Sequence, residues 1–361
     1  MQLNRILRWA ITIGLFIIPF IPFVVVTSMF FPFITGKNFT FRILIEIIFA
    51  LWLILALRDS SVLPKRSPIT LAVLGFFSII TLAGLFGVNP YHSFWSNYER
   101  MEGLITHLHL FAYFLVVTSI LSTEKLWKWF LHTVLLSGVI LSGYAILQLR
   151  GVLVINQGGV RIDATFGNTV YFATYMLFNV GLAAYYFFRT ETKRWFHYGY
   201  LALAALFFIM IYYTATRGAL LGFVAGTFLT LLLFAIARAG LVRKISLGLL
   251  VAGVLLGGSI FLLRDSSFVK NSLTLSRLAK ISLNDETTRA RFANMGIAWK
   301  GFLERPILGW GTENYNLVFN KYYDPRLYGQ EQWFDRVHNI LFDWLVGAGI
   351  LGLLAYLALF G

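Results

Sequence analysis

The feature that most constrains this chain is a series of apolar stretches, each about 20 residues long. A stretch of that length can cross the hydrocarbon core of a bilayer as one helix, which satisfies its own backbone hydrogen bonds there. We predict ten such spans, at residues 9–35, 39–57, 69–87, 103–122, 126–149, 166–188, 197–215, 217–237, 244–263 and 338–360. The predicted fold class is therefore all-α: a polytopic helical membrane protein.

Composition agrees with this prediction, because 58% of the 361 residues are hydrophobic and only 13% are charged. A soluble domain of this length does not need so much apolar surface. The first span is not expected to be a cleaved signal peptide, since it is long, contains Pro19, Pro22 and Pro32, and lacks a small-residue cleavage site. The absence of cysteine excludes disulfides, thiolate catalysis and cysteine metal sites.

The basic residues between the spans predict the orientation. With the N-terminus in the cytoplasm, the inward loops carry thirteen Lys and Arg residues and the short outward segments carry six. This distribution follows the positive-inside rule. We predict one transmembrane domain, residues 1–361, in which residues 264–337 form a large extracytoplasmic loop facing the periplasm or the cell exterior. We also expect the natural protein to continue beyond Gly361.

The net charge of +14 does not indicate a nucleic-acid partner, because the basic residues are scattered in loops between spans. They are better explained as orientation signals and as contacts with anionic lipid or a phosphate-bearing substrate. In a bacterium, the membrane concerned would be the cytoplasmic (inner) membrane.

The long loop has a helix of its own in "DETTRARFANMGIAWKGFLERPILGWG". The helix is predicted to begin at a capping Asp285 or Thr287 and to end near Arg305, before Pro306. Its predicted apolar positions are Phe292, Met295, Ile297, Ala298 and Phe302.

Outward arginines are the first candidates for chemistry. An arginine near the bilayer costs free energy unless its charge is paired or hydrated. A guanidinium can also bind phosphate with two parallel hydrogen bonds. Taken singly, each arginine has the alternative explanation of a snorkelling or solvated side chain. Their convergence on one membrane face favours an anion site, and the residues concerned are Arg100, Arg161, Arg217, Arg289 and Arg291.

His338 is the second kind of candidate, because it lies on the outward side where the long loop meets the last span. A neutral imidazole there could take a proton from an acceptor hydroxyl. Asp335 could orient the ring if the helix begins that early, and Asn339 is its polar neighbour. The alternative is an interfacial histidine that only caps the helix.

No metal or nucleotide motif accompanies these residues. The chain has no HExxH, no acidic cluster, no Walker loop and no Rossmann fingerprint, so we expect no metal and no cofactor. Outward aromatic residues could stack on sugar rings, namely Trp95, Tyr98, Trp310, Tyr322, Tyr323, Trp333 and Phe334.

Four segments together resemble the O-antigen ligase and O-antigen polymerase superfamily of bacterial membrane glycosyltransferases. They are "SFWSNYERMEGLITHLHLFAYFL", "TRGALLGF", "RFANMGIAWKGFLERPILGWGTENY" and "DRVHNILFDWLVGAGILGLLAYL". The His-Asn pair followed by a glycine-rich helix is the most specific of them. The sequence departs from the family at Gly347, where members often have glutamate, and members usually have further spans.

The resemblance implies a fold and a set of roles. The fold would be a C-type glycosyltransferase-like bundle that works without metal on polyprenyl-diphosphate-linked glycans, such as those on undecaprenyl diphosphate. Arg217 and Arg291 would hold the diphosphate and His338 would be the catalytic residue. Arg291 is preferred to Arg289 because it lies fifteen residues before Pro306.

The expected activity is transfer of a glycan from the lipid carrier to an acceptor hydroxyl, with inversion at the anomeric carbon, as in lipopolysaccharide and other cell-envelope polysaccharide biosynthesis. The expected partners are the lipid-linked oligosaccharide donor, a glycan, lipid or protein acceptor, and membrane lipids. Polymerase or protein O-oligosaccharyltransferase activity is an alternative within the superfamily. A transporter or flippase for a lipid-linked anion is an alternative from another class, which would place its charges near the bilayer midplane.

Overall fold

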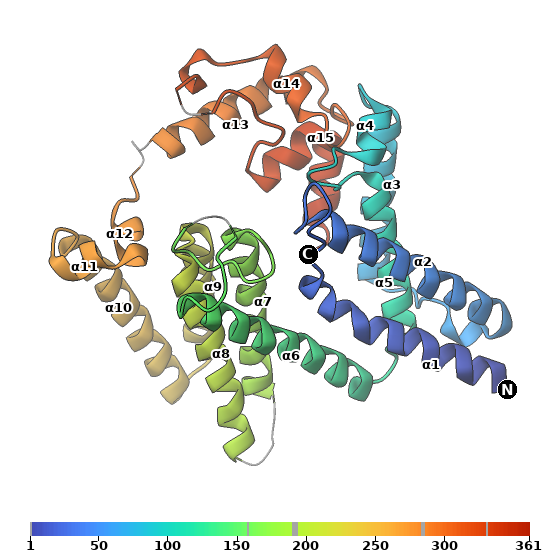
Figure 1. Ribbon diagram of the computed structural model, residues 1–361, viewed down its shortest axis with the longest axis horizontal. Helices are drawn as coiled ribbons and strands as arrows, with labels where there is room; N and C mark the ends of the chain where they lie inside the picture. The colour runs from blue at the N-terminus through green and yellow to red at the C-terminus, as the bar shows by residue number, and fades with distance from the viewer. Residues whose placement is uncertain (1, 157–158, 190–193, 283–285, 330) are drawn as a thin grey trace. The chain divides into compact units, whose positions relative to one another are not determined.

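The computed structural model describes residues 2–156, 159–189, 194–282, 286–329 and 331–361, and within these ranges every regular element is a helix (Figure 1). The α-helices are α1 (Gln2–Ile17), α2 (Thr35–Arg58), α3 (Pro68–Leu85), α4 (Pro90–Trp95), α5 (Leu104–Ile120), α6 (Glu124–Leu149), α7 (Thr169–Arg189), α8 (Arg194–Thr214), α9 (Arg217–Ala237), α10 (Gly240–Leu262), α11 (Ser267–Asn271), α12 (Leu273–Ala279), α13 (Glu286–Glu304), α14 (Tyr315–Lys321) and α15 (Ile340–Leu357). Three 3₁₀ helices join them, η1 (Ile18–Phe23), η2 (Ser60–Val62) and η3 (Pro325–Leu327).

The prediction of a polytopic helical membrane protein is confirmed. Nine helical segments of the described chain are long and apolar enough to cross a bilayer, and α5 is a shorter apolar helix. These ten elements correspond to the ten predicted spans.

The predicted bounds of the first span are wrong. The helix begins at Gln2 rather than near residue 9, and it closes with the 3₁₀ turn η1 at Phe23 instead of continuing to residue 35. Proline explains the end, because Pro19 and Pro22 cannot donate the backbone hydrogen bonds that would continue an α-helix. Residues 24–34 are apolar but not helical.

The chain forms two compact units, of which the first contains residues 1–128 and 282–361. In this unit α1 packs on α2, α2 on α5, and α3 on α15. Phe76 and Ile80 of α3 form an apolar cluster with Leu104, against which Trp344 and Tyr356 of α15 pack. The first and last membrane helices of the sequence therefore belong to one structure.

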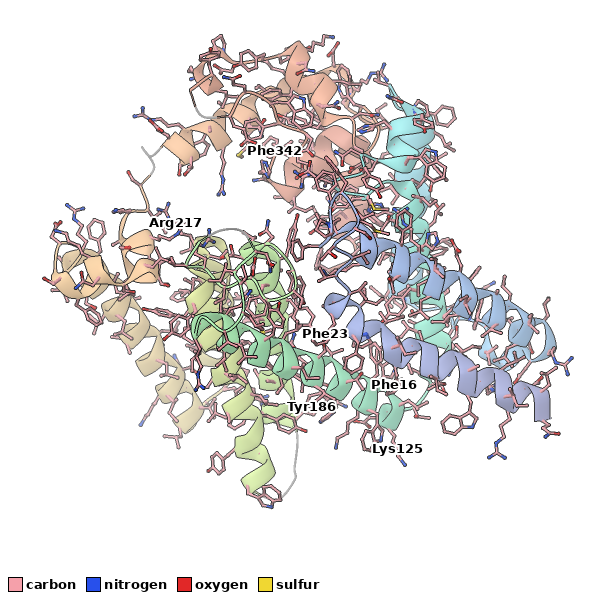
Figure 2. The ribbon with its side chains drawn as sticks, in the orientation of Figure 1. Phe16, Phe23, Lys125, Tyr186, Arg217 and Phe342 are labelled. Carbon is pink, nitrogen blue, oxygen red and sulfur yellow. The ribbon has the colours of Figure 1, made fainter. Side chains whose placement is uncertain are left out.

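The part of this first unit that contains residues 286–337 is built around α13 and α14. Their buried apolar residues include Ile297, Ala298, Val318 and Phe319, and Phe342 of α15, labelled in Figure 2, packs against the same core. The predicted end of the loop helix, near Arg305, is confirmed, because α13 ends at Glu304.

The predicted apolar face of α13 is partly wrong. Ile297 and Ala298 are buried as expected, but Phe292 is 57% exposed, and the side chain of Asn294 is buried. A polar contact decides the rotation of the helix, because the Asn294 amide hydrogen-bonds the backbone that leads to His338. The proposed cap Asp285 lies outside the described residues, and Thr287 lies one residue inside the helix.

The segment after α13 docks into a break in α15. Gly349 has φ 66°, which interrupts the helix. The Ile350 N–H donates to the Pro306 carbonyl at 2.8 Å, and the Trp310 N–H donates to the Val346 carbonyl at 2.8 Å. Backbone groups that the break exposes are thus satisfied by residues of the segment 306–310.

The second unit contains residues 129–281. Its helices α7 and α8 pack closely on each other, as do α9 and α10, and the short α12 contacts the ends of α8, α9 and α10. Most side chains of α10 are exposed and apolar, as expected of a helix that faces lipid. The assignment of residues 1–361 to one transmembrane domain stays a prediction.

Candidate active site

In the first unit, the candidate site is built around the turn that carries His338. This residue has φ 59°, a left-handed conformation that costs a non-glycine residue about 1–2 kcal/mol. It persists because both flanks of the turn are fixed by side chains.

Three side chains hold the turn. The Asn294 amide donates to the Arg336 carbonyl at 3.1 Å and to the Val337 carbonyl at 3.0 Å. The Val337 N–H donates to the Asp343 carboxylate at 2.9 Å. Asn339 then caps α15, its side chain accepting from the N–H groups of Leu341 and Phe342.

The geometry departs from the expected role of Asp335. The helix begins at Ile340, so the condition under which Asp335 would orient the imidazole is not met. Instead the carboxylate receives two hydrogen bonds from Arg100, the Nη2 contact measuring 2.9 Å. Burial tends to raise the pKa of Asp335, but Arg100 holds the pKa below its usual value.

A second ion-pair group adjoins the first. The Arg336 guanidinium contacts Glu102 at 2.6 Å and Glu313 at 2.5 Å, and Glu313 also accepts a hydrogen bond from Ser96 at 2.6 Å. Ser96 and Glu313 share the left-handed conformation of His338, with φ 62° and 69°. Non-glycine residues in this conformation gather at functional sites more than elsewhere.

The His338 ring itself is hydrogen-bonded by no residue that the structure describes. It lies edge-on to the Phe334 ring, with centroids 5.5 Å apart. Loss of hydration lowers the pKa of His338, as do the charges of Arg100, Arg291 and Arg336, while Asp335 partly opposes them. The imidazole is therefore neutral at pH 7, with a nitrogen lone pair for a proton.

Arg291 and Arg289 lie on different faces of α13. The charge of Arg291 acts on His338, whereas Arg289 lines a groove with Lys300 on another face of the helix. Two residues apart on a helix means a rotation of roughly 200°. The structure thus brings Arg291, Arg100, Asp335, His338 and Asn339 together and leaves Arg289 apart.

The second unit holds the other candidate arginines. Arg217, labelled in Figure 2, is the first residue of α9, and only Ala215 and Thr216 separate it from α8. Arg161 braces this corner, its Nε donating to the Thr214 carbonyl at 2.8 Å and its Nη2 to the Thr216 hydroxyl at 3.1 Å. Ala215 takes the left-handed conformation, with φ 48°.

Sequence reasoning missed Arg277 in this second cluster. Burial lowers the pKa of Arg161, and the charge of Arg277 lowers it further, so the two guanidinium groups are close. Arg277 is brought there by α12, whose Thr274 hydroxyl donates to the Tyr212 carbonyl at 2.7 Å. The only signal in the sequence is the capping residue Ser272 before a short apolar helix.

The arrangement can bind anions and accept a proton. Cationic groups gather at Arg161, Arg217 and Arg277 in one unit and at Arg291 and Arg100 in the other. Among the residues described, no group of three or more His, Cys, Asp or Glu is placed to hold a metal ion.

Comparison with known proteins gives one family. The family model described as O-antigen ligase matches residues 202–357, from within α8 to the end of α15. This range includes Arg217, Arg291 and His338 and leaves out Arg100 and Arg161. No curated protein matches the chain.

Proposed function

We propose that this chain, whose residues 202–357 match the family model described as O-antigen ligase, is a membrane enzyme of that superfamily and transfers a glycan from a polyprenyl-diphosphate carrier to an acceptor hydroxyl. The reaction would take place at the outer face of the bacterial cytoplasmic membrane, where the long loop meets the last span. The observation that carries this proposal is His338, a neutral imidazole held in a strained turn beside cationic groups.

His338 is the proposed general base. A ring nitrogen removes the proton of the acceptor hydroxyl while its oxygen forms a bond to the anomeric carbon. The bond from that carbon to the diphosphate oxygen breaks, and the electron pair leaves with the polyprenyl diphosphate. Attack from the face opposite the leaving group inverts the anomeric configuration. The proton on His338 then returns to solvent.

Arg291 and Arg217 are the proposed diphosphate ligands. Negative charge grows on the leaving group as the bond breaks, and preorganised guanidinium groups stabilise that charge more than the ground state. We propose that this stabilisation takes the place of a metal ion. Arg161 is a positioning residue, since its hydrogen bonds fix the corner from which Arg217 extends.

The test uses the purified full chain with a polyprenyl-diphosphate oligosaccharide and candidate acceptors. Loss of the lipid-linked donor and gain of glycan on the acceptor are followed together, for wild type and His338→Ala at equal folded amounts. We expect His338→Ala to lower the transfer rate at least about 100-fold, the usual contribution of a general base. Equal transfer by both proteins would remove His338 from the mechanism.

The acceptor separates the activities within the superfamily. Transfer to a lipid acceptor supports a ligase, transfer to a second lipid-linked glycan supports a polymerase, and transfer to a protein supports an O-oligosaccharyltransferase. Movement of the intact donor across a vesicle membrane, without transfer, would contradict all three and support a transporter.

A further inference from the structure

A groove lies along the face of α13 that points away from His338. It encloses about 840 Å³ between α13 and the segment 324–329. Its floor consists of small or apolar residues, which are Ala290, Ala293, Gly296, Ile297 and Leu327. Its charged lining consists of Glu286, Arg289, Lys300, Asp324 and Arg326.

The helix repeat explains why these residues form one continuous surface. Arg289, Ala293, Gly296 and Lys300 follow the spacing i, i+4, i+7 and i+11, which places them on one stripe of α13. From Arg289 to Lys300 the stripe is roughly 16 Å long, at 1.5 Å per residue. A chain of several sugar rings fits such a length, whereas a single small ligand would leave most of it empty.

The charges of the groove do not cancel. Asp324 is engaged by Arg326, whose Nη2 lies 2.6 Å from one carboxylate oxygen, and these hydrogen bonds lower the pKa of Asp324 to about 2. Arg289 forms no hydrogen bond or ion pair with any residue described. Lys300 lies over the Tyr322 ring, at 6.0 Å, and its charge also acts on Asp324 without forming an ion pair with it. With Glu286 as the one other acid, the lining keeps an excess of positive charge.

The floor suits a pyranose ring. A Cβ added to Gly296 would meet no atom within 4 Å, so the backbone of α13 is open to the groove at its centre. Phe292 lines the same groove with 57% of its surface exposed, and an aromatic face is a common platform for the apolar side of a sugar. The cationic side chains, the floor of small residues and the exposed aromatic ring together favour a sugar chain with negative groups as the ligand of the groove.

We propose that this groove is a subsite for an acidic glycan, one that carries carboxylate or phosphate groups, and that it holds the part of the donor's glycan remote from the reacting sugar. This inference rests on the proposed function. The helix supports it, because α13 presents Arg291 to the His338 side and the groove to the other, so one rigid element would hold both ends of a long donor. Binding energy from such a remote part can be used at the reacting centre.

The first experiment measures binding without turnover. The full chain in lipid nanodiscs is titrated with trigalacturonic acid and, separately, with neutral galactotriose. We expect the acidic trisaccharide to bind at least tenfold more tightly, and the Arg289→Ala/Lys300→Ala double variant to lose at least tenfold in affinity for it. Lys280→Ala, which removes an exposed cation outside the groove, is the control and should bind as wild type does.

A steric pair keeps the test independent of charge. Gly296→Trp fills the groove and should abolish binding, whereas Gly296→Ala adds a methyl group to open space and should bind within about twofold of wild type. Thermal unfolding of both variants checks that each one is folded before its binding is compared. If wild type does not bind the acidic sugar, or if all variants bind it equally, the groove is not a glycan subsite.

The kinetic arm identifies the source of the glycan. With an acidic donor, the double variant should raise the donor KM several-fold more than with a neutral donor, and the acceptor KM should stay the same. A rise in the acceptor KM instead would overturn the assignment to the donor. Binding that persists in a chain with no transferase activity would contradict the proposed function and leave the subsite standing.

Discussion

At the scale of the residue, His338 combines backbone strain with a shifted pKa. Asn294, Asp343 and Asn339 restrain the turn, so the strain is held by the surrounding structure and not by the ring itself. The sequence identified the histidine but not this restraint. Asn294 lies 44 positions earlier in the chain, and no local pattern connects the two residues.

The backbone strain at His338 predicts that replacing this residue by glycine stabilises the protein and removes its activity. His338→Gly should raise the free energy of unfolding by about 0.5–1 kcal/mol, because glycine adopts a positive φ without a steric penalty. The same change should abolish transfer. Thermal unfolding and initial rates on the same preparation measure both effects. A less stable glycine variant would show that the imidazole ring, through its contact with Phe334, stabilises the turn.

The pKa of His338 predicts the acid limb of the rate profile. The pKa lies below its ordinary value near 6.5, so kcat/KM should fall with acidity only below that pH. Arg100→Gln removes a neighbouring cation and frees the Asp335 carboxylate, and both changes favour the protonated ring. The acid limb should therefore move to higher pH, while Arg100→Lys should move it less. If the acid limb of the kcat/KM profile lies at the same pH in Arg100→Gln as in wild type, His338 is not the titrating base.

At the scale of the element, α13 separates two arginines that lie two residues apart. The preference for Arg291 over Arg289 came from the resemblance, and the structure supplies a physical difference between the two sites. Arg100 and Arg161 were candidate anion ligands by sequence, but Arg100 is paired with Asp335 and Arg161 with backbone and hydroxyl oxygens of a helix corner. Such partners, up to 235 positions away, cannot be read from a single sequence.

The two arginines of α13 should differ in their effect. Arg291→Ala should lower transfer at least 100-fold, the scale of one lost electrostatic stabiliser, whereas Arg289→Ala should lower it by less than about tenfold. Initial rates at saturating acceptor and equal folded protein measure the difference. The reverse order would show that the face of α13 assigned to the reacting centre is wrong.

Helix α15 offers a second matched pair. A Cβ on Gly349 would lie 2.2 Å from the Ile307 carbonyl oxygen, in a residue with φ 66°, so Gly349→Ala should destabilise the protein by about 2–3 kcal/mol or more. A Cβ on Gly347 meets nothing nearer than 3.6 Å, and Gly347→Ala should be neutral within about 1 kcal/mol. Thermal unfolding in detergent compares the two. Equal midpoints would contradict the break at Gly349.

At the scale of the whole molecule, the sequence predicted the membrane fold well, because bilayer thickness imposes a length and a composition on every span. The sequence did not predict the features that bilayer thickness does not constrain. The end of the first span depends on Pro19 and Pro22, and the role of Arg277 depends on the packing of α12, so neither follows from hydropathy.

Orientation is the prediction at this scale, and the chain is well suited to its measurement. It contains no cysteine, so any single introduced cysteine reports without background. In intact cells, Tyr328→Cys in the exposed part of the long loop should react with a membrane-impermeant maleimide, whereas Lys65→Cys should react only after the membrane is permeabilised. The reverse pattern would place the long loop, and with it His338, in the cytoplasm.

The docking of residues 306–310 into the break of α15 has a consequence for recombination between relatives. The contacts are made by backbone groups of Pro306, Trp310, Val346 and Ile350, so they survive almost any change of side chain but not a change of chain length on either side. A chimaera that exchanges only the long loop, residues 264–337, would separate the two halves of this joint. Exchange of residues 286–357 as one block would keep the joint whole, and this block also carries Asn294, Asn339 and Asp343, the three side chains that hold the histidine turn.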